Sequence, residues 1–115
     1  MKQLSIFLEN KQGTLIQVLN LLKKANIQII ASTIADTAEY GIYRIICDNT
    51  EQAYLILKEN GIAVNLTDVN CIELDDTPGS AADAIAKLVE ANVNIAYLYS
   101  FLLNGKGMLV YRVKQ

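Results

Sequence analysis

Two short turns contain the residue types in this chain that could bind a small ligand. One reads Asn10-Lys11-Gln12-Gly13-Thr14 and the other reads Asp76-Thr77-Pro78-Gly79-Ser80. Each lies where an apolar strand pattern ends and an amphipathic helical pattern begins. A helix start presents backbone N–H groups and the positive end of the helix dipole, so it can bind a carboxylate without a basic side chain. The polar side chains of the turns could then bind the ammonium group of a zwitterion.

A purely structural interpretation of the same turns stays open. Gly13 and Gly79 could serve only to allow a positive φ, while Thr14 or a neighbour, and Ser80, could serve only to cap helices. The repetition of the turn does not decide between the two interpretations, because duplication copies structural features as faithfully as functional ones.

The two turns belong to an internal repeat. With a shift of 66 residues and no gap, residues 5–49 match residues 71–115 in pattern. A register without gaps over this length indicates a duplicated unit. The identical pairs are Ile6/Ile72, Leu8/Leu74, Gly13/Gly79, Leu22/Leu88, Ala25/Ala91, Asn26/Asn92, Ile29/Ile95 and Gly41/Gly107.

The first unit, residues 1–67, shows six elements. Alternating apolar residues predict a strand over 3–9, and the stripe of Leu15, Val18, Leu19 and Leu22 predicts a helix that ends near residue 26. Strands follow over 27–35 and 42–47, joined by a turn at 37–41 into a hairpin. A capping box of Asn49 or Thr50 with Gln52, a helix ending at Asn60-Gly61 and a strand over 62–66 complete the unit. This order predicts an α+β, ferredoxin-like βαββαβ fold with helices on one face of an antiparallel sheet.

The second unit, residues 68–115, repeats only the first four of these elements. Strands are predicted over 70–75, 93–102 and 108–113, with a helix over 80–91 and a turn at Asn104-Gly105. The counterparts of the second helix and the fourth strand do not occur in the sequence. The strand over 70–75 therefore has an exposed edge that invites pairing with another chain, and we expect a homodimer.

Composition narrows the classes of function. The 115 residues are 52% hydrophobic and include no His or Trp. The net charge of −2 disfavours nucleic acid as a partner. The lack of His disfavours metal sites and most catalytic triads. Cys47 and Cys71 lie in apolar runs, as buried hydrophobic residues do. No apolar run is long enough to span a membrane, so a cytoplasmic location is the default expectation. No cofactor is predicted.

Other clusters favour structural roles over chemistry. Asp68, Glu73, Asp75 and Asp76 lack the spacing of a calcium loop, so a solvated face is the preferred interpretation. The aromatic residues at 97, 99 and 101 share one face of a strand, where they pack between units or line a pocket. An RNA-recognition fold has the same element order, but the basic and aromatic strand pattern that it needs does not occur.

The motifs resemble those of the ACT domain, a small-molecule-sensing module of ferredoxin-like topology. The resemblance rests on the Asp-x-Pro-Gly turn before a helix and on the strands that begin Asn26-Ile27-Gln28-Ile29 and Asn92-Val93-Asn94-Ile95. It covers essentially the whole chain, which is similar to stand-alone tandem ACT proteins of bacteria without an enzyme domain. The second turn fits closely, whereas the first has Asn10 in place of Asp and Gln12 in place of Pro.

The resemblance implies two units side by side, with an amino acid held between the turn of one unit and the neighbouring strand of the other. It implies a non-catalytic sensor or regulatory protein with a regulated enzyme as partner; a dimerisation and protein-docking module is the alternative. We expect the turn at Gly79, facing residues 30–33, to be the better site. The implied ligand-binding residues are Asn10, Gln12, Gly13, Thr14, Ile30, Ala31, Ser32, Asp76, Pro78, Gly79, Ser80, Tyr97 and Leu98.

Overall fold

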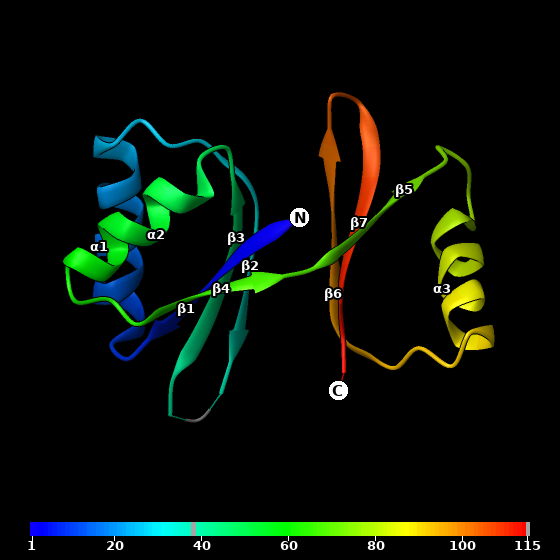
Figure 1. The fold of residues 1–115 in the computed structure, drawn as a ribbon, viewed down its shortest axis with the longest axis horizontal. Helices are drawn as coiled ribbons and strands as arrows, with labels where there is room; N and C mark the ends of the chain where they lie inside the picture. The colour runs from blue at the N-terminus through cyan, green and yellow to red at the C-terminus, as the bar shows by residue number, and fades with distance from the viewer. Residues whose placement is uncertain (38, 115) are drawn as a thin grey trace. The chain divides into compact units, whose positions relative to one another are not determined.

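The chain is divided into two compact units. The computed structural model describes residues 1–37 and 39–114. One unit is Lys2–Thr67, and the other combines Met1 with the chain from Asp68 onward (Figure 1). Ala38 in the predicted turn at 37–41 and Gln115 at the end of the predicted repeat lie outside the described residues.

The unit Lys2–Thr67 has the predicted order of strands and helices. Its sheet has the strand order β2-β3-β1-β4, with β3 antiparallel to both β1 and β2. Both helices lie on one face of this sheet (Figure 1). The predicted ferredoxin-like architecture is confirmed. The elements are β1 (Lys2–Leu8), α1 (Lys11–Lys24), β2 (Ile29–Asp36), β3 (Gly41–Cys47), α2 (Thr50–Glu59) and β4 (Val64–Asp68).

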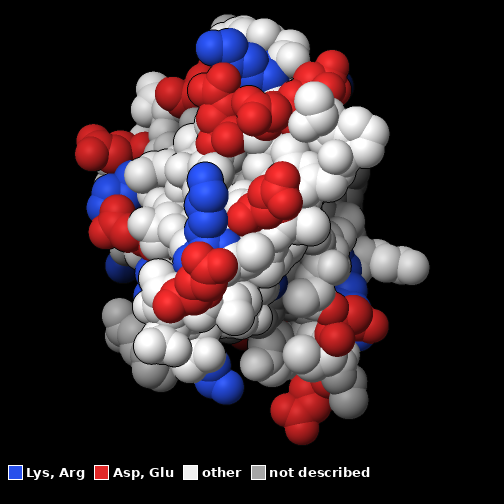
Figure 2. All heavy atoms as spheres, turned by 90° about the vertical axis from the view of Figure 1, so that its right-hand side faces the viewer, with Lys and Arg blue, Asp and Glu red and all other residues white. Residues whose placement is uncertain are grey.

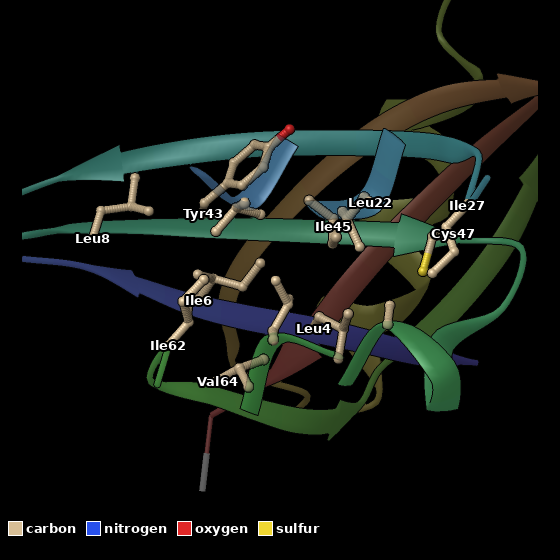
Figure 3. Close-up of a cluster of buried hydrophobic side chains, with 13 residues drawn as sticks. Leu4, Ile6, Leu8, Leu22, Ile27, Tyr43, Ile45, Cys47, Ile62 and Val64 are labelled. Carbon is tan, nitrogen blue, oxygen red and sulfur yellow. The ribbon is translucent and has the colours of Figure 1, made fainter. Parts of the chain in front are cut away.

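The core of this unit lies between the helices and the sheet (Figure 3). The alternating residues Leu4, Ile6 and Leu8 of β1 are at most 1% exposed, because every second side chain of the strand points to the helices. From α1 the predicted stripe contributes Val18 and Leu22, both buried. From α2, Ala53 and Leu57 are fully buried. Both helices therefore bury the stripe that their sequence predicts.

The three helices within the described residues end in the same way, each followed by a residue with a left-handed backbone. Asn26 has φ 58°, Asn92 has φ 60° and Gly61 has φ 75°. In α1, Asn26 N–H donates to the Lys23 carbonyl at 3.0 Å and Ile27 N–H donates to the Leu22 carbonyl at 3.0 Å. This pair of bonds is the Schellman motif. The N–H groups of Asn26 and Ile27 are thus used to end α1, and the Gln28 N–H donates to the Asp48 carboxylate. Strand β2 begins at Ile29 and not at the predicted residue 27.

The second unit contains β5 (Asn70–Leu74), α3 (Ser80–Glu90), β6 (Ile95–Leu103) and β7 (Lys106–Val113). Its antiparallel sheet has the order β5-β7-β6. The predicted turn at Asn104-Gly105 is confirmed, with φ 53° and 78°. In contrast to α1 and α2, no residue of α3 is buried. The apolar face of this helix is therefore only half covered.

Candidate functional site

The first predicted binding turn is the capped first turn of α1. Helix α1 begins at Lys11, and Asn10 is its N-cap residue. The Asn10 side-chain oxygen accepts a hydrogen bond from Gly13 N–H at 3.2 Å, and the Asn10 carbonyl accepts one from Thr14 N–H at 2.7 Å. Gly13 is therefore helical, and the expectation of a positive φ at this glycine is wrong. Asn10, and not Thr14, caps the helix.

Lys11 adds a fixed cation to the same turn. Its ammonium group forms an ion pair with Asp36 and donates to the Thr37 carbonyl at 3.1 Å. These contacts place the start of α1 beside the end of β2. The Asn10 oxygen that could have bound a ligand ammonium is already engaged with Gly13, while Gln12 is exposed and Thr14 is half-buried. This turn is the weaker candidate for a ligand.

The predicted strand residues of this unit lie at the opposite end of β2. In the register of the sheet, Ile29 pairs with Cys47 and Ser32 pairs with Ile45, whereas Asp36 pairs with Gly41 next to Leu8. Within Lys2–Thr67 the structure therefore does not bring Ile30, Ala31 and Ser32 to the Asn10 turn. Ala31 is buried, and a bulge lies between Ile29 and Ala31.

The second turn has a different geometry at its glycine. Gly79 is the N-cap residue of α3 and has φ 91°, a left-handed conformation that favours glycine. The Ser80 hydroxyl donates to the Asp75 carbonyl at 2.8 Å, and Ser80 N–H donates to the Thr77 carbonyl at 3.2 Å. These two bonds fold the turn back on itself. Ser80 therefore staples the turn and does not cap the helix.

The start of α3 has no side-chain cap. In α1 and α2 the side chains of Asn10 and Asn49 accept from the backbone, at 3.2 and 3.3 Å. Among the helices of the described residues, α3 alone lacks such a bond. The first N–H groups of a helix have no partner within it. The N–H groups of Ala81 and Ala82 therefore remain available to an anion from outside the helix.

A hollow of about 550 Å³ adjoins this turn. Its volume lies within the range of small-molecule sites, about 300 to 1,000 Å³. On one side it is lined by the turn, including Asp75, Asp76 and Pro78, and on the other by Leu102, Gly105 and Gly107 of the β6–β7 hairpin. These hairpin residues are not among the ligand-binding residues predicted from sequence, although the repeated pair Gly41/Gly107 pointed to Gly107. The hollow is thus bounded by a polar turn and an apolar hairpin.

Acidic side chains mark the rim of this hollow. Asp75 and Asp76 are both exposed, and nearby Glu73 forms an ion pair with Lys106 at 3.4 Å. Figure 2, viewed from the α3 side of Figure 1, shows acidic side chains gathered toward the upper end of that face. The carboxylates provide a place for a ligand ammonium group, while the start of α3 provides one for a carboxylate.

Tyr97 and Leu98 lie away from this hollow within their own unit. Leu98 pairs with Tyr111, which in turn pairs with Asn70 at the start of β5. The hollow lies at the other end of the sheet, where Leu102 pairs with Gly107 and Gly107 with Leu74. Of the predicted residues in the second unit, the structure brings Asp76, Pro78, Gly79 and Ser80 together and leaves Tyr97 and Leu98 apart from them.

A hollow of similar volume, about 560 Å³, lies at the end of α1, where Lys23, Gln28 and Asp48 line it. Its polar groups bind one another: the Asp48 carboxylate accepts from Gln28 N–H, and Asp48 N–H donates to the Gln28 carbonyl, each at 3.1 Å. Because these contacts fasten β2 to the end of β3, we assign them a structural role.

The thiols are poorly suited to nucleophilic chemistry. Burial raises the pKa of Cys47, and hydrogen bonds from the Thr50 side chain and the Asn49 backbone offset only part of this rise. Burial also raises the pKa of Cys71. A thiol with a raised pKa is a weak nucleophile at neutral pH because little thiolate forms. In the part of the chain that the structure describes, no group of three or more His, Cys, Asp or Glu residues could hold a metal ion. No helix over those residues is long and apolar enough to cross a membrane.

Comparison with known proteins agrees with this architecture of two ferredoxin-like units. A protein of Bacteroides thetaiotaomicron has a crystal structure that is similar over 99% of this chain and 79% of that chain, with 44% identity and a TM-score of 0.90. The α and β subunits of aspartokinase match over 96% of this chain and 80% of that chain, with 18% identity and a TM-score of 0.68. The regulatory subunit of aspartate kinase from Thermus thermophilus matches over 96% of this chain and 81% of that chain, with 14% identity and a TM-score of 0.65. No curated protein matches the sequence significantly.

These likenesses place the chain in a class of proteins with the same fold over almost all of its length. The family described as the ACT domain pair matches residues 1–115. The chain therefore belongs to the ACT domain pair family, and the family resemblance of its motifs is confirmed.

Proposed function

We propose that this protein is a non-catalytic, amino-acid-binding regulatory module whose ligand is held at the start of α3. The supporting observation is that α3 starts without a side-chain cap beside a hollow, which Ser80, the first residue of the helix, lines together with Asp75 and Asp76. The ligand carboxylate accepts hydrogen bonds from Ala81 and Ala82 N–H, and the ligand ammonium group lies against Asp76. A zwitterion carries one charge of each sign, one for each of these two kinds of group.

The remainder of the proposed site comes from the family resemblance. A strand of the neighbouring unit, Ile30 to Ser32, would face the turn at Gly79, while Tyr97 and Leu98 would face the turn at Asn10. The Asn10 turn is the poorer partner, because its side-chain cap and the ion pair of Lys11 already satisfy the groups that would bind a zwitterion. We therefore propose one occupied site, at Gly79.

The proposed mechanism is a shift in the relative position of the units. A ligand that contacts both units stabilises the relative position in which both contacts form. The size of the shift between the two relative positions is set by the difference in the ligand's affinity for them. The altered surface is then recognised by a regulated enzyme in the cytoplasm. The regulatory subunit of aspartate kinase from Thermus thermophilus shares this fold, and we expect an enzyme partner by analogy with it.

Isothermal titration calorimetry with each of the common amino acids tests the proposal. We expect one of them to bind, and Asp76→Asn to weaken its binding about tenfold, because a hydrogen-bonded charge pair is lost. Glu90→Gln is the matched control, since it removes one exposed carboxylate at the other end of α3 and should leave the affinity unchanged. Absence of binding for every amino acid would refute the proposal.

A docking module without a small-molecule ligand is the second candidate. The observation that favours it is apolar exposure on β6, where Leu98 is 47% and Leu102 is 74% exposed. Such side chains suit a protein partner. If no amino acid binds, and Leu102→Ser abolishes association with a partner captured by the wild type, the docking function replaces the sensor function.

A further inference from the structure

The hollow beside the start of α3 has a counterpart in the first unit. The shift of 66 residues that relates the two units also aligns the residues around the hollow. The sheet register agrees with this alignment, since Leu102 pairs with Gly107 just as Asp36 pairs with Gly41. The two places can therefore be compared residue by residue. The aligned pairs are Lys11/Thr77, Asp36/Leu102, Glu39/Gly105 and Gly41/Gly107.

A lysine side chain fills the counterpart in the first unit. A Cβ at Gly41 would meet Cγ of Lys11 at 3.7 Å, so the stem of Lys11 lies over this glycine. The Lys11 ammonium group is held by the Asp36 carboxylate and the Thr37 carbonyl. Lys11 is the first residue of α1 and belongs to a part of the repeat that both units contain. The first unit thus covers this place with a side chain from its own turn.

The same place is open in the second unit. Thr77, which aligns with Lys11, has a much shorter side chain. Among the described residues other than its chain neighbours, a Cβ at Gly107 would meet only Leu74 within 4 Å, and a Cβ at Gly105 would meet none. The hollow of about 550 Å³ therefore includes the space that corresponds to the Lys11 side chain.

The hairpin side of the hollow is apolar. Leu102 is 74% exposed where the first unit has the carboxylate of Asp36, and Gly105 stands in place of Glu39. The two acidic side chains that the first unit has on this side are thus absent from the second. An exposed leucine gains free energy when an apolar group covers it. The hairpin side therefore favours an apolar group and offers no carboxylate to a basic one.

The charges around the hollow exclude an acidic group. No Lys or Arg is among the described residues that line it, whereas Asp75 and Asp76 both do. A second carboxylate on the ligand would be repelled by these two side chains and would find no cation to pair with. A ligand in this hollow can therefore have one carboxylate, at the start of α3, and no other anionic group.

We propose that the amino acid held at the start of α3 has an uncharged, apolar side chain, which lies in this hollow against Leu102. The inference rests on the proposed function, and it names the class of ligand. The turn and the helix start bind the charged groups of the ligand, while its side chain takes the space that the stem of Lys11 takes in the first unit. Leu102 then determines which side chains are accepted.

Isothermal titration calorimetry of the whole chain with two groups of amino acids tests this inference. One group is valine, leucine and phenylalanine, and the other is threonine, asparagine, aspartate and lysine. Valine resembles threonine in shape, and leucine resembles asparagine, so differences within these pairs report polarity. We expect the tightest ligand to be in the first group, with a Kd about tenfold or more below that of any member of the second group, because burial of its side chain is lost there.

Two variants test the role of the hairpin. Leu102→Asp should raise the Kd of the apolar ligand about tenfold or more, since it replaces the apolar contact by a charge. Thr77→Lys combined with Leu102→Asp restores the pair found in the first unit, and the long side chain should fill the hollow and abolish detectable binding. Leu55→Asp, the same change at a leucine of α2 that is 56% exposed, is the matched control and should leave the affinity unchanged.

Circular dichroism establishes that the variants are folded, which is expected because Thr77 and Leu102 are exposed. Tightest binding of a polar or charged amino acid would overturn the inference, and so would an unchanged affinity of Leu102→Asp for the apolar ligand. In both cases an amino acid still binds, so the proposed function stands. Absence of binding for every amino acid would refute the proposed function itself and this inference with it. The two failures are therefore distinguishable.

Discussion

The aligned glycines Gly13 and Gly79 should respond in different ways to the same substitution by alanine. At Gly79 there is free space, since a Cβ would meet no atom within 4 Å, but the residue has φ 91°. At Gly13 the backbone is helical, and a Cβ would meet the Asn10 side-chain amide at 3.2 Å. Gly79→Ala therefore strains the backbone, whereas Gly13→Ala leaves the backbone unstrained but crowds the Asn10 side chain.

The two costs can be estimated separately. A non-glycine residue in the left-handed region costs about 1 to 2 kcal/mol, so Gly79→Ala should destabilise the protein by about that amount. Alanine inside a helix gains about 0.5 to 1 kcal/mol over glycine, and at Gly13 this gain is offset by the small shift demanded of Asn10. Gly13→Ala should therefore be close to neutral. Gly79→Asn should cost less than Gly79→Ala, since asparagine tolerates this conformation, as it does at Asn26, Asn92 and Asn104.

Urea and thermal unfolding followed by circular dichroism measure these differences. A loss of 1 kcal/mol corresponds to a drop in Tm of about 4 to 8 °C for a unit of this size. The assignment of the two backbone conformations would be wrong if Gly79→Ala were as stable as the wild type and Gly13→Ala had a lower free energy of unfolding than Gly79→Ala. The aligned turns would then share one geometry.

Three further predictions concern the stability of the fold. Asn10→Ala and Asn49→Ala each remove a side-chain cap and should lower the free energy of unfolding in urea by about 1 kcal/mol; no loss in either variant would contradict the cap assignment. Leu57→Ala should cost about 2 to 5 kcal/mol because Leu57 is fully buried, whereas Leu88→Ala should cost clearly less because Leu88 is half-buried; equal losses would contradict the difference in cover between the units. The raised pKa of Cys47 keeps its thiol protonated in the fold, so its contribution to stability is complete below pH 9.0 and is lost as pH rises through the higher pKa of the folded state. Cys47→Ala should therefore reduce the fall in the urea midpoint above pH 9.0, and an unchanged fall would show that this thiol does not titrate differently on unfolding.

The repeat made the architecture predictable from sequence. Apolar stripes such as Val18 with Leu22 place helices directly, because burial imposes the helical period. One half of the predicted capping box is confirmed, since the Asn49 side chain accepts from Gln52 N–H at 3.3 Å. The Gln52 side chain accepts instead from the Asn49 side-chain amide, at 2.9 Å. The strand starts after α1 and α3 were less predictable. Asn26 and Asn92 end their helices with bonds that use the next residue as well, and apolar content alone does not reveal this.

Less of the site could be predicted. The alignment of Gly13 with Gly79 suggested two equivalent turns. However, Asn10 caps α1, which begins at Lys11, three residues before Thr14, whereas Gly79 is itself the N-cap residue of α3. The presence or absence of one capping side chain separates the two. The contribution of Leu102 and Gly105 to the hollow depends on sheet register, and the register is a tertiary property that strand patterns alone did not specify.

The amide resonances of the two helix starts provide the most direct test of ligand binding at α3. In an NMR titration with the amino acid that binds, the proposed site predicts that the N–H signals of Ala81 and Ala82 move as their protons bond to the ligand carboxylate. The signals of Gly13 and Thr14 serve as internal references, because both N–H groups already have partners in Asn10. Movement at Gly13 and Thr14 without movement at Ala81 and Ala82 would contradict the proposed site.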